Sequence, residues 1–161
     1  MYPLPRLSPP PTRRPAALGG FSLIEVLVVV TILGIAAAIS IPKIARITTQ
    51  NRVQRAAFAL SSDVQQAFAI AGRNRAPVRL AWNSAKMQLQ VTNLAGSTVY
   101  RRTGLGTGAG YGFTSSEVSM TPTSLVVFPT GLAADTLVIA LSKGGFSKTI
   151  RVSRAGMVRL Q

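Results

Sequence analysis

The sequence contains no cysteine and no histidine, and its four acidic residues stand against 18 lysines and arginines. Without cysteine or histidine, the usual zinc and transition-metal sites, a cysteine nucleophile and a histidine-based triad are excluded. The serines and lysines show no spacing typical of a catalytic dyad. We therefore predict a protein that is not an enzyme and that binds no metal and no cofactor.

The formal net charge is +14. A positive excess of this size is typical of proteins that bind an acidic partner, such as nucleic acid or anionic lipid. A solvated basic surface without a partner gives the same composition, so both interpretations stay open.

The first 20 residues are rich in proline and end in the pair Gly19-Gly20. Proline removes helical hydrogen bonds and the glycine pair marks a break, so no stable helix is expected here. We predict that residues 1–20 are a leader peptide that is not part of the fold.

Residues 21–41 form an apolar run whose only charged side chain is Glu25. Twenty-one helical residues span roughly 30 Å, the thickness of a bilayer core, so we predict a transmembrane helix over residues 21–42. A soluble helix seldom stays apolar on all sides for this length. Basic residues before the run predict a cytoplasmic N-terminus, with the remainder of the chain on the other side of the inner membrane. An ordinary secretory signal would have its cleavage site after the run, where 36–38 is a candidate; the glycine pair before it and the internal acid argue against this.

The helical pattern resumes after Pro42, which predicts a kink there and an amphipathic helix over residues 43–75. Apolar residues at steps of three and four share one face: Val53, Ala57, Leu60, Val64, Phe68 and Ala71. Four basic residues crowd the first turns: Lys43, Arg46, Arg52 and Arg55. They either touch anionic headgroups or only end the apolar span.

After residue 75 the apolar period changes to two, which is typical of strands. Residues 78–82 and 87–91 predict a β-hairpin, and 98–101 a short strand before the glycine-rich loop 103–112. Further strands are predicted at 124–128, 136–142, 147–153 and 157–161. The predicted fold is α+β, with a long N-terminal helix packed on an antiparallel β-sheet or β-sandwich domain over residues 76–161. Gly104, Gly106 and Ala109 imitate a dinucleotide-binding motif, but no βαβ unit surrounds them.

Glu25 is the sharpest candidate site. A carboxylate in a membrane helix costs roughly 2.5–3.5 kcal/mol on insertion scales, so such a residue usually has a partner. A free α-amine, produced by a cut before Phe21, would be protonated at neutral pH and could pair with Glu25 of a neighbouring subunit. Alternatively, the side chain reaches the headgroups at the interface. The residues alone do not choose between these interpretations.

The segment GFSLIEV, residues 20–26, strongly resembles the prepilin-peptidase site of type IV pilins and type II secretion pseudopilins. The resemblance implies cleavage between Gly20 and Phe21 on the cytoplasmic face and N-methylation of Phe21. It also implies that Glu25 recruits the subunit into a filament and that Pro42 is the kinking proline of many pilins. The implied partners are other pilins or pseudopilins, the prepilin peptidase, the inner-membrane assembly platform and the membrane. The implied location is the inner membrane, with the C-terminal domain periplasmic until filament assembly.

The remainder resembles the H-type pseudopilin and FimT-like branch, through the turn FPTG at 128–131 and the ending IRVSRAGMVR at 150–159. This resemblance implies a minor subunit at or near a filament tip. FimT-like members can bind DNA through a basic Gly-Arg-x-Arg motif, of which Gly156 and Arg159 are present and the first arginine is replaced by Met157. Candidate DNA contacts are Lys148, Arg151, Arg154 and Arg159. Basic strand edges also block aggregation, so this alternative stays open, as does a bitopic membrane enzyme or lipid-binding anchor.

Overall fold

The computed structural model describes residues 20–161, so all of the predicted leader except Gly20 lies outside the described residues. A single helix, α1, spans Leu23–Asn74 and has 52 residues. It ends where Arg75 adopts a positive φ of 48° and Pro77 follows. Both features stop a helix, because neither can continue the hydrogen-bonded ladder. The helix is continuous through position 42, and a kink at Pro42 stays a prediction.

Two compact units divide the chain, the first ending at Ser40 and the second running from Ile41 to Gln161. In the first unit every described residue is exposed, including its apolar ones. Of the described helices, α1 is long and apolar enough to cross a membrane. Exposed apolar side chains on all sides of a helix are stable only against lipid or other protein chains.

In the second unit, α1 buries one face in the core. Val53, Ala57, Leu60, Val64 and Ala71 are at most 1% exposed, and Phe68 is partly buried against them. The predicted apolar face is therefore confirmed. Its spacing of three and four residues places these side chains on one side of the helix, where they meet the sheets.

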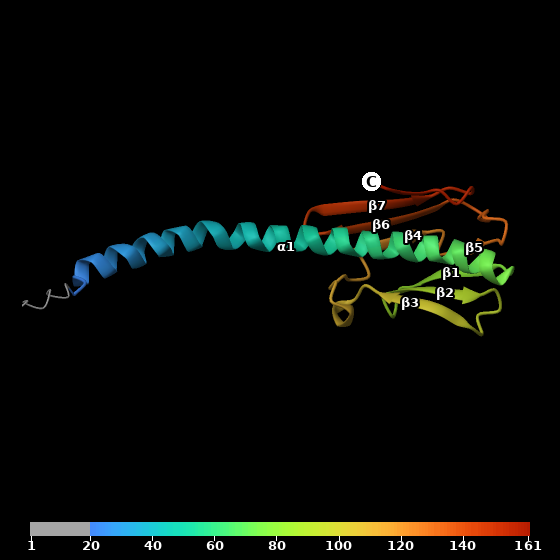
Figure 1. Cartoon of the computed structure of the whole chain (residues 1–161), viewed down its shortest axis with the longest axis horizontal. Helices are drawn as coiled ribbons and strands as arrows, with labels where there is room; N and C mark the ends of the chain where they lie inside the picture. Colours follow the sequence, from blue (N-terminus) through green and yellow to red (C-terminus); the bar gives the residue numbers. More distant parts are fainter. Residues whose placement is uncertain (1–19) are drawn as a thin grey trace, which may run out of the picture. The chain divides into compact units, whose positions relative to one another are not determined.

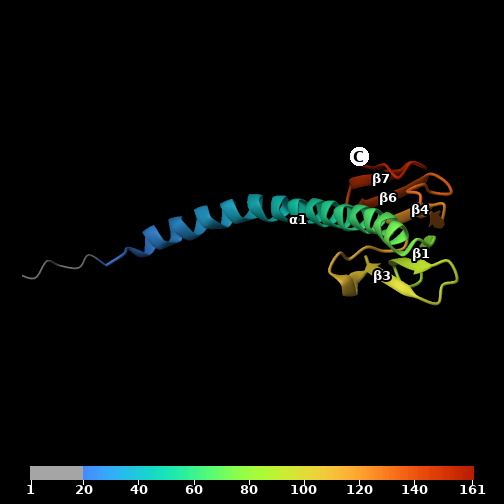
Figure 2. The same cartoon turned by 45° about the vertical axis from the view of Figure 1, so that its right-hand side comes forward.

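Eight strands form two four-stranded antiparallel sheets with the orders β3-β2-β1-β5 and β4-β6-β7-β8. Their bounds are β1 Val78–Asn83, β2 Gln88–Asn93, β3 Val99–Gly104, β4 Val118–Thr121, β5 Ser124–Val127, β6 Leu137–Lys143, β7 Phe146–Val152 and β8 Val158–Leu160. Figure 1 shows β1, β2 and β3 on one side of the second half of α1 and β6 and β7 on the other. Figure 2 shows the same separation after a turn of 45°. The predicted α+β class is confirmed.

The core is one cluster to which α1 and both sheets contribute. Leu80 and Val91 face each other across β1 and β2, and Ile139 and Ile150 do so across β6 and β7; all four are buried. Alternate residues of these strands point away from the core, as the period of two predicts. The two sheets and the helix thus bury a shared core without a disulfide.

One strand was not predicted from the sequence. β4, at Val118–Thr121, buries Val118 and Met120 and pairs with β6. It has four residues and is followed at once by Pro122, and a strand of this length gives too few alternations for a periodicity signal. The glycine-rich segment is also more ordered than a loop, since it includes a 3-10 turn at Thr107–Ala109.

The glycine-rich segment is fastened to the second sheet by Lys143. Its Nζ donates to the carbonyl oxygen of Gly112 and to Glu117, with 2.9 Å to Oε2 of that carboxylate. It also lies 5.5 Å from the centroid of the Phe113 ring. The hydrogen bond from Lys143, together with those from Thr114, holds the pKa of Glu117 below its ordinary value.

Candidate functional site

The residues around the predicted cleavage site lie at the start of α1. Gly20 and Phe21 precede the helix, and the Phe21 side chain is 82% exposed. The Ser22 Oγ accepts a hydrogen bond of 3.2 Å from the Glu25 backbone N–H. Ser22 is therefore the N-cap of the helix, and it fixes the first turn immediately after the Gly20–Phe21 bond.

Glu25 is the third residue of this helix, three positions after its cap. A carboxylate in the first turn is stabilised by the partial positive charge of the helix N-terminus. The side chain is exposed, and no ion pair within residues 20–161 includes it. Its charge is therefore free to meet a cation outside the described chain.

The four candidate DNA contacts do not form one surface. Lys148 and Arg151 both lie on β7 but are three residues apart, so they point to opposite faces of the sheet. Lys148 is half-buried and lines a small hollow with Gln50 and Gln54 of α1. Arg154 lies in the turn after β7 and pairs with Asp135 at 3.3 Å. Hydrogen bonds from the Thr136 backbone and from Arg154 lower the pKa of Asp135.

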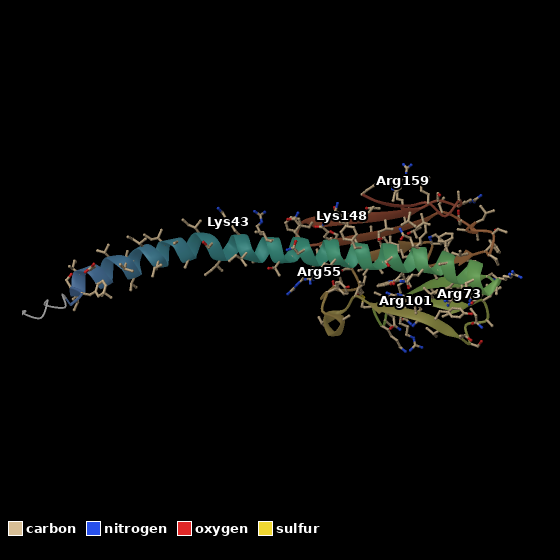
Figure 3. The ribbon with its side chains drawn as sticks, viewed as in Figure 1. Lys43, Arg55, Arg73, Arg101, Lys148 and Arg159 are labelled. Carbon is tan, nitrogen blue, oxygen red and sulfur yellow. The ribbon has the colours of Figure 1, made fainter. Side chains whose placement is uncertain are left out.

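Arg151 and Arg159 do come together. They are directly opposite each other across β7 and β8, and both are exposed. They line a shallow hollow of about 470 Å³ on the outer face of the second sheet, with Val138 and Met157. Figure 3 shows Arg159 pointing away from the sheet. No acidic residue within residues 20–161 pairs with either arginine, and like charges in direct opposition destabilise a sheet. An anion bound between the two guanidinium groups would reduce this repulsion.

The described residues hold no metal cluster: no group of three or more Asp or Glu side chains within residues 20–161 could hold an ion.

Comparisons with known proteins give three results. Residues 19–41 match the family model described as the prokaryotic N-terminal methylation motif. The fold matches a crystal structure of the Pseudomonas aeruginosa (strain PAO1) type IV minor pilin FimU in space group P21, with a TM-score of 0.55 and 18% identity over 71% of this chain and 92% of that one. A second crystal form of FimU, in space group P65, gives a TM-score of 0.53 and 19% identity over 67% and 91%. A search of curated protein sequences found no match.

The chain thus has the prokaryotic N-terminal methylation motif and a fold similar to that of the type IV minor pilin FimU. The resemblance predicted from residues 20–26 is thereby confirmed. The matched motif spans Gly20, Phe21 and Glu25 and includes the whole apolar run of residues 21–41.

Two features of this chain were not predicted from the sequence. Ser22 was noted as part of the motif, but its role as N-cap was not; the spacing of Ser22 and Glu25 is that of a capping box and carried the signal. The buried Asp63 and its ion pair with Arg101 were also missed. These two residues are separated by 38 positions, and no local pattern joins them.

Proposed function

We propose that this protein is a minor subunit of a type IV pilus or type II secretion filament, and that it acts at or near the filament tip. A prepilin peptidase cuts between Gly20 and Phe21 on the cytoplasmic face and methylates Phe21. Residues 21–42 hold the subunit in the inner membrane, with the domain in the periplasm. The assembly platform then draws it into the filament through Glu25.

The observation that carries this proposal is the unpartnered Glu25 in the capped first turn. A carboxylate four residues after a new N-terminus cannot be neutralised by its own apolar neighbours, so it needs a cation from elsewhere in the bilayer. The α-amine of a neighbouring mature subunit, charged at neutral pH, supplies one. Such a pair sets the register of one subunit against the next and excludes subunits that have not been processed.

The test is incorporation of Glu25→Ala into purified filaments. We expect the variant to be inserted and cleaved normally but to be strongly depleted from filaments. Thr31→Ala is a matched control on the same exposed helix, because the Thr31 hydroxyl bonds only to the Leu27 carbonyl of its own helix. Normal incorporation of Glu25→Ala would contradict the assembly role.

The two filament systems are separated by deleting the gene. If secretion of a type II substrate protein collapses and returns on complementation, the subunit belongs to the secretion system. If secretion is unchanged, surface pili and DNA uptake are the quantities to measure next.

A second candidate function, DNA capture for natural transformation, is favoured by the facing pair of Arg151 and Arg159. A phosphate placed between them would remove their repulsion, and each phosphate neutralised releases counterions. The double variant Arg151→Gln/Arg159→Gln should therefore weaken binding of the full chain to duplex DNA and lower the salt slope by about 2. Arg73→Gln/Arg75→Gln is the control of equal charge. Binding that does not depend on salt, or equal losses in both variants, would count against this function.

A further inference from the structure

Six basic side chains lie on the first turns of α1 in the second unit or on segments that contacts connect to these turns. We name this group the collar: Lys43, Arg46, Arg52, Arg55, Lys86 and Lys148. The first four lie on α1. Lys86 lies in the turn between β1 and β2, and Lys148 lies on β7. Within residues 20–161 none of the six forms an ion pair. Figure 3 shows Lys43, Arg55 and Lys148 in this part of the molecule, while Arg73 lies near the other end of the helix.

Close contacts bring the second sheet to this level of the helix. The turn between β6 and β7 contains Gly144, and a Cβ added there would lie 2.9 Å from the Thr49 Cγ2. Lys148 follows on β7 and lines a hollow with Gln50 and Gln54. Lys148 therefore lies beside the turns of α1 that carry Arg52 and Arg55.

Another chain of contacts brings the first sheet to the same place. A Cβ added at Gly112 would lie 4.0 Å from Arg52 Nη1. The Gly112 N–H donates to the Gly106 carbonyl at 3.2 Å. Gly106 in turn lies beside Met87, the neighbour of Lys86 in the turn between β1 and β2. Lys148 on β7 thus lies beside α1, and the turn that carries Lys86 is connected to Arg52 through Met87, Gly106 and Gly112.

The acidic residues of the second unit cannot neutralise the collar. Asp63 pairs with Arg101, Glu117 with Lys143 and Asp135 with Arg154. The collar therefore keeps six positive charges. Tyr111 and Phe146 lie in the segments that carry Gly112 and Lys148, and both are half-buried. Aromatic side chains beside basic ones are typical of protein surfaces at the headgroup layer.

We propose that the collar docks the folded domain on the anionic headgroups of the membrane that holds residues 21–41, before the subunit joins a filament. This inference rests on the membrane anchoring in the proposed function. Lys43 follows the apolar segment directly, and at 1.5 Å per residue the helix reaches Thr49 about 10 Å later. This distance is about one Debye length at physiological salt, so the charges on the turns beside Thr49 are attracted electrostatically to the anionic membrane surface.

Duplex DNA would also attract these charges, but the observations favour lipid. Lys43 and Arg46 directly follow the apolar stretch in the sequence, so a membrane that holds this stretch brings its anionic surface to the start of the collar. The facing pair of Arg151 and Arg159 lies instead on the outer face of the second sheet. DNA binding at the collar is therefore an outcome that the test must detect.

The chain has no cysteine, so single cysteines can carry a fluorescent probe. Ala85 and Ala95 are matched positions, because both are exposed alanines in turns at opposite ends of β2. The full chain, labelled at Ala85→Cys or Ala95→Cys, is placed in nanodiscs of zwitterionic lipid or of the same lipid with anionic phosphatidylglycerol. A quencher attached to a lipid headgroup then reports which probe lies near the membrane surface.

We expect quenching at position 85 in anionic nanodiscs and little at position 95, with loss of the difference at high salt. Because each charge near an anionic surface contributes about a fivefold factor at most, Arg52→Gln/Lys86→Gln should lower the docked-to-free ratio by up to about 25-fold. Arg73→Gln/Arg75→Gln removes the same charge far from the collar and should leave the ratio unchanged.

Equal quenching at both positions, or equal quenching in zwitterionic and anionic nanodiscs, would overturn the inference. Either result would leave the membrane anchoring intact. Release of the full chain from both kinds of nanodisc would contradict the anchoring itself, and the inference with it. If added duplex DNA binds to the wild type and not to Arg52→Gln/Lys86→Gln, while anionic lipid has no effect, the collar serves DNA and the lipid assignment is wrong.

Discussion

Arg101, on the edge strand β3, forms an ion pair with Asp63 on the buried face of α1. The Asp63 side chain is 1% exposed and the Arg101 side chain is 42% exposed. One carboxylate oxygen of Asp63 is buried and has no hydrogen-bond partner within residues 20–161. The pair therefore connects the edge of the first sheet to the helix. Asp63 needs its partner more than Arg101 does, because only Arg101 can reach water.

The different burial of Asp63 and Arg101 predicts that removing either residue lowers the stability by a different amount. Arg101→Met leaves a carboxylate buried without its cation, and we expect a loss of about 3 kcal/mol in the free energy of unfolding. Asp63→Asn leaves Arg101 able to reach water, so its loss should be about 1 kcal/mol. Denaturant unfolding of the full chain in detergent measures both. A larger loss for Asp63→Asn than for Arg101→Met would contradict the assignment of the buried member.

Gly156 is predicted to serve the fold rather than a ligand. It has a φ of +76°, and an added Cβ would lie 2.9 Å from the Gly131 carbonyl oxygen and 3.2 Å from a Phe68 ring carbon. Gly156→Ala should therefore destabilise the domain by about 1–3 kcal/mol.

The control for this prediction is Gly145→Ala. That position has a similar φ of +83°, but nothing lies within 4 Å of the added Cβ. The control shows the backbone strain alone, so thermal unfolding should rank it as the milder change. Equal effects of the two substitutions would mean that the contact with Phe68 and Gly131 contributes nothing.

The ion pair of Glu117 and Lys143 predicts a dependence of stability on pH. The pKa of Glu117 is lowered in the folded state, chiefly by the hydrogen bond from Lys143. Its contribution is therefore complete above the unfolded pKa and is lost as the pH falls through the folded one. The wild type should exceed Glu117→Gln in stability at pH 7, and the difference should begin to shrink near the ordinary glutamate pKa of about 4.3 and vanish once the pH is below the lowered pKa of the folded state. A difference that grows on acidification would have the wrong sign.

The local elements of the fold could be predicted because their signals are local. The apolar spacing from Val53 to Ala71 predicted the buried helical face, and the alternation around Leu80 and Leu89 predicted the first hairpin. The prediction did not give the strand order, in which β5 pairs with β1 rather than with β4. Such pairings depend on contacts between distant parts of the chain, which no local window contains.

In the candidate site too, the features with a local sequence signal could be predicted and those that depend on distant contacts could not. The motif at residues 20–26 predicted the assembly segment, and its cap at Ser22 could have been predicted from the spacing to Glu25. The separation of Lys148 from Arg151 also follows from strand alternation, once the strand is known. The opposition of Arg151 and Arg159 depends on the register of β7 and β8, which the sequence alone does not fix.

Cleavage before Phe21 can be measured by determining the N-terminus of the protein after expression with a prepilin peptidase. Intact mass and N-terminal fragment masses give the first residue and its modification together. We predict a chain that begins at Phe21 and carries one methyl group on its α-amine, and an uncleaved chain when the peptidase is catalytically inactive. A chain cut after the apolar stretch, near Ala38, or one that keeps its first 20 residues beside an active peptidase, would contradict this prediction.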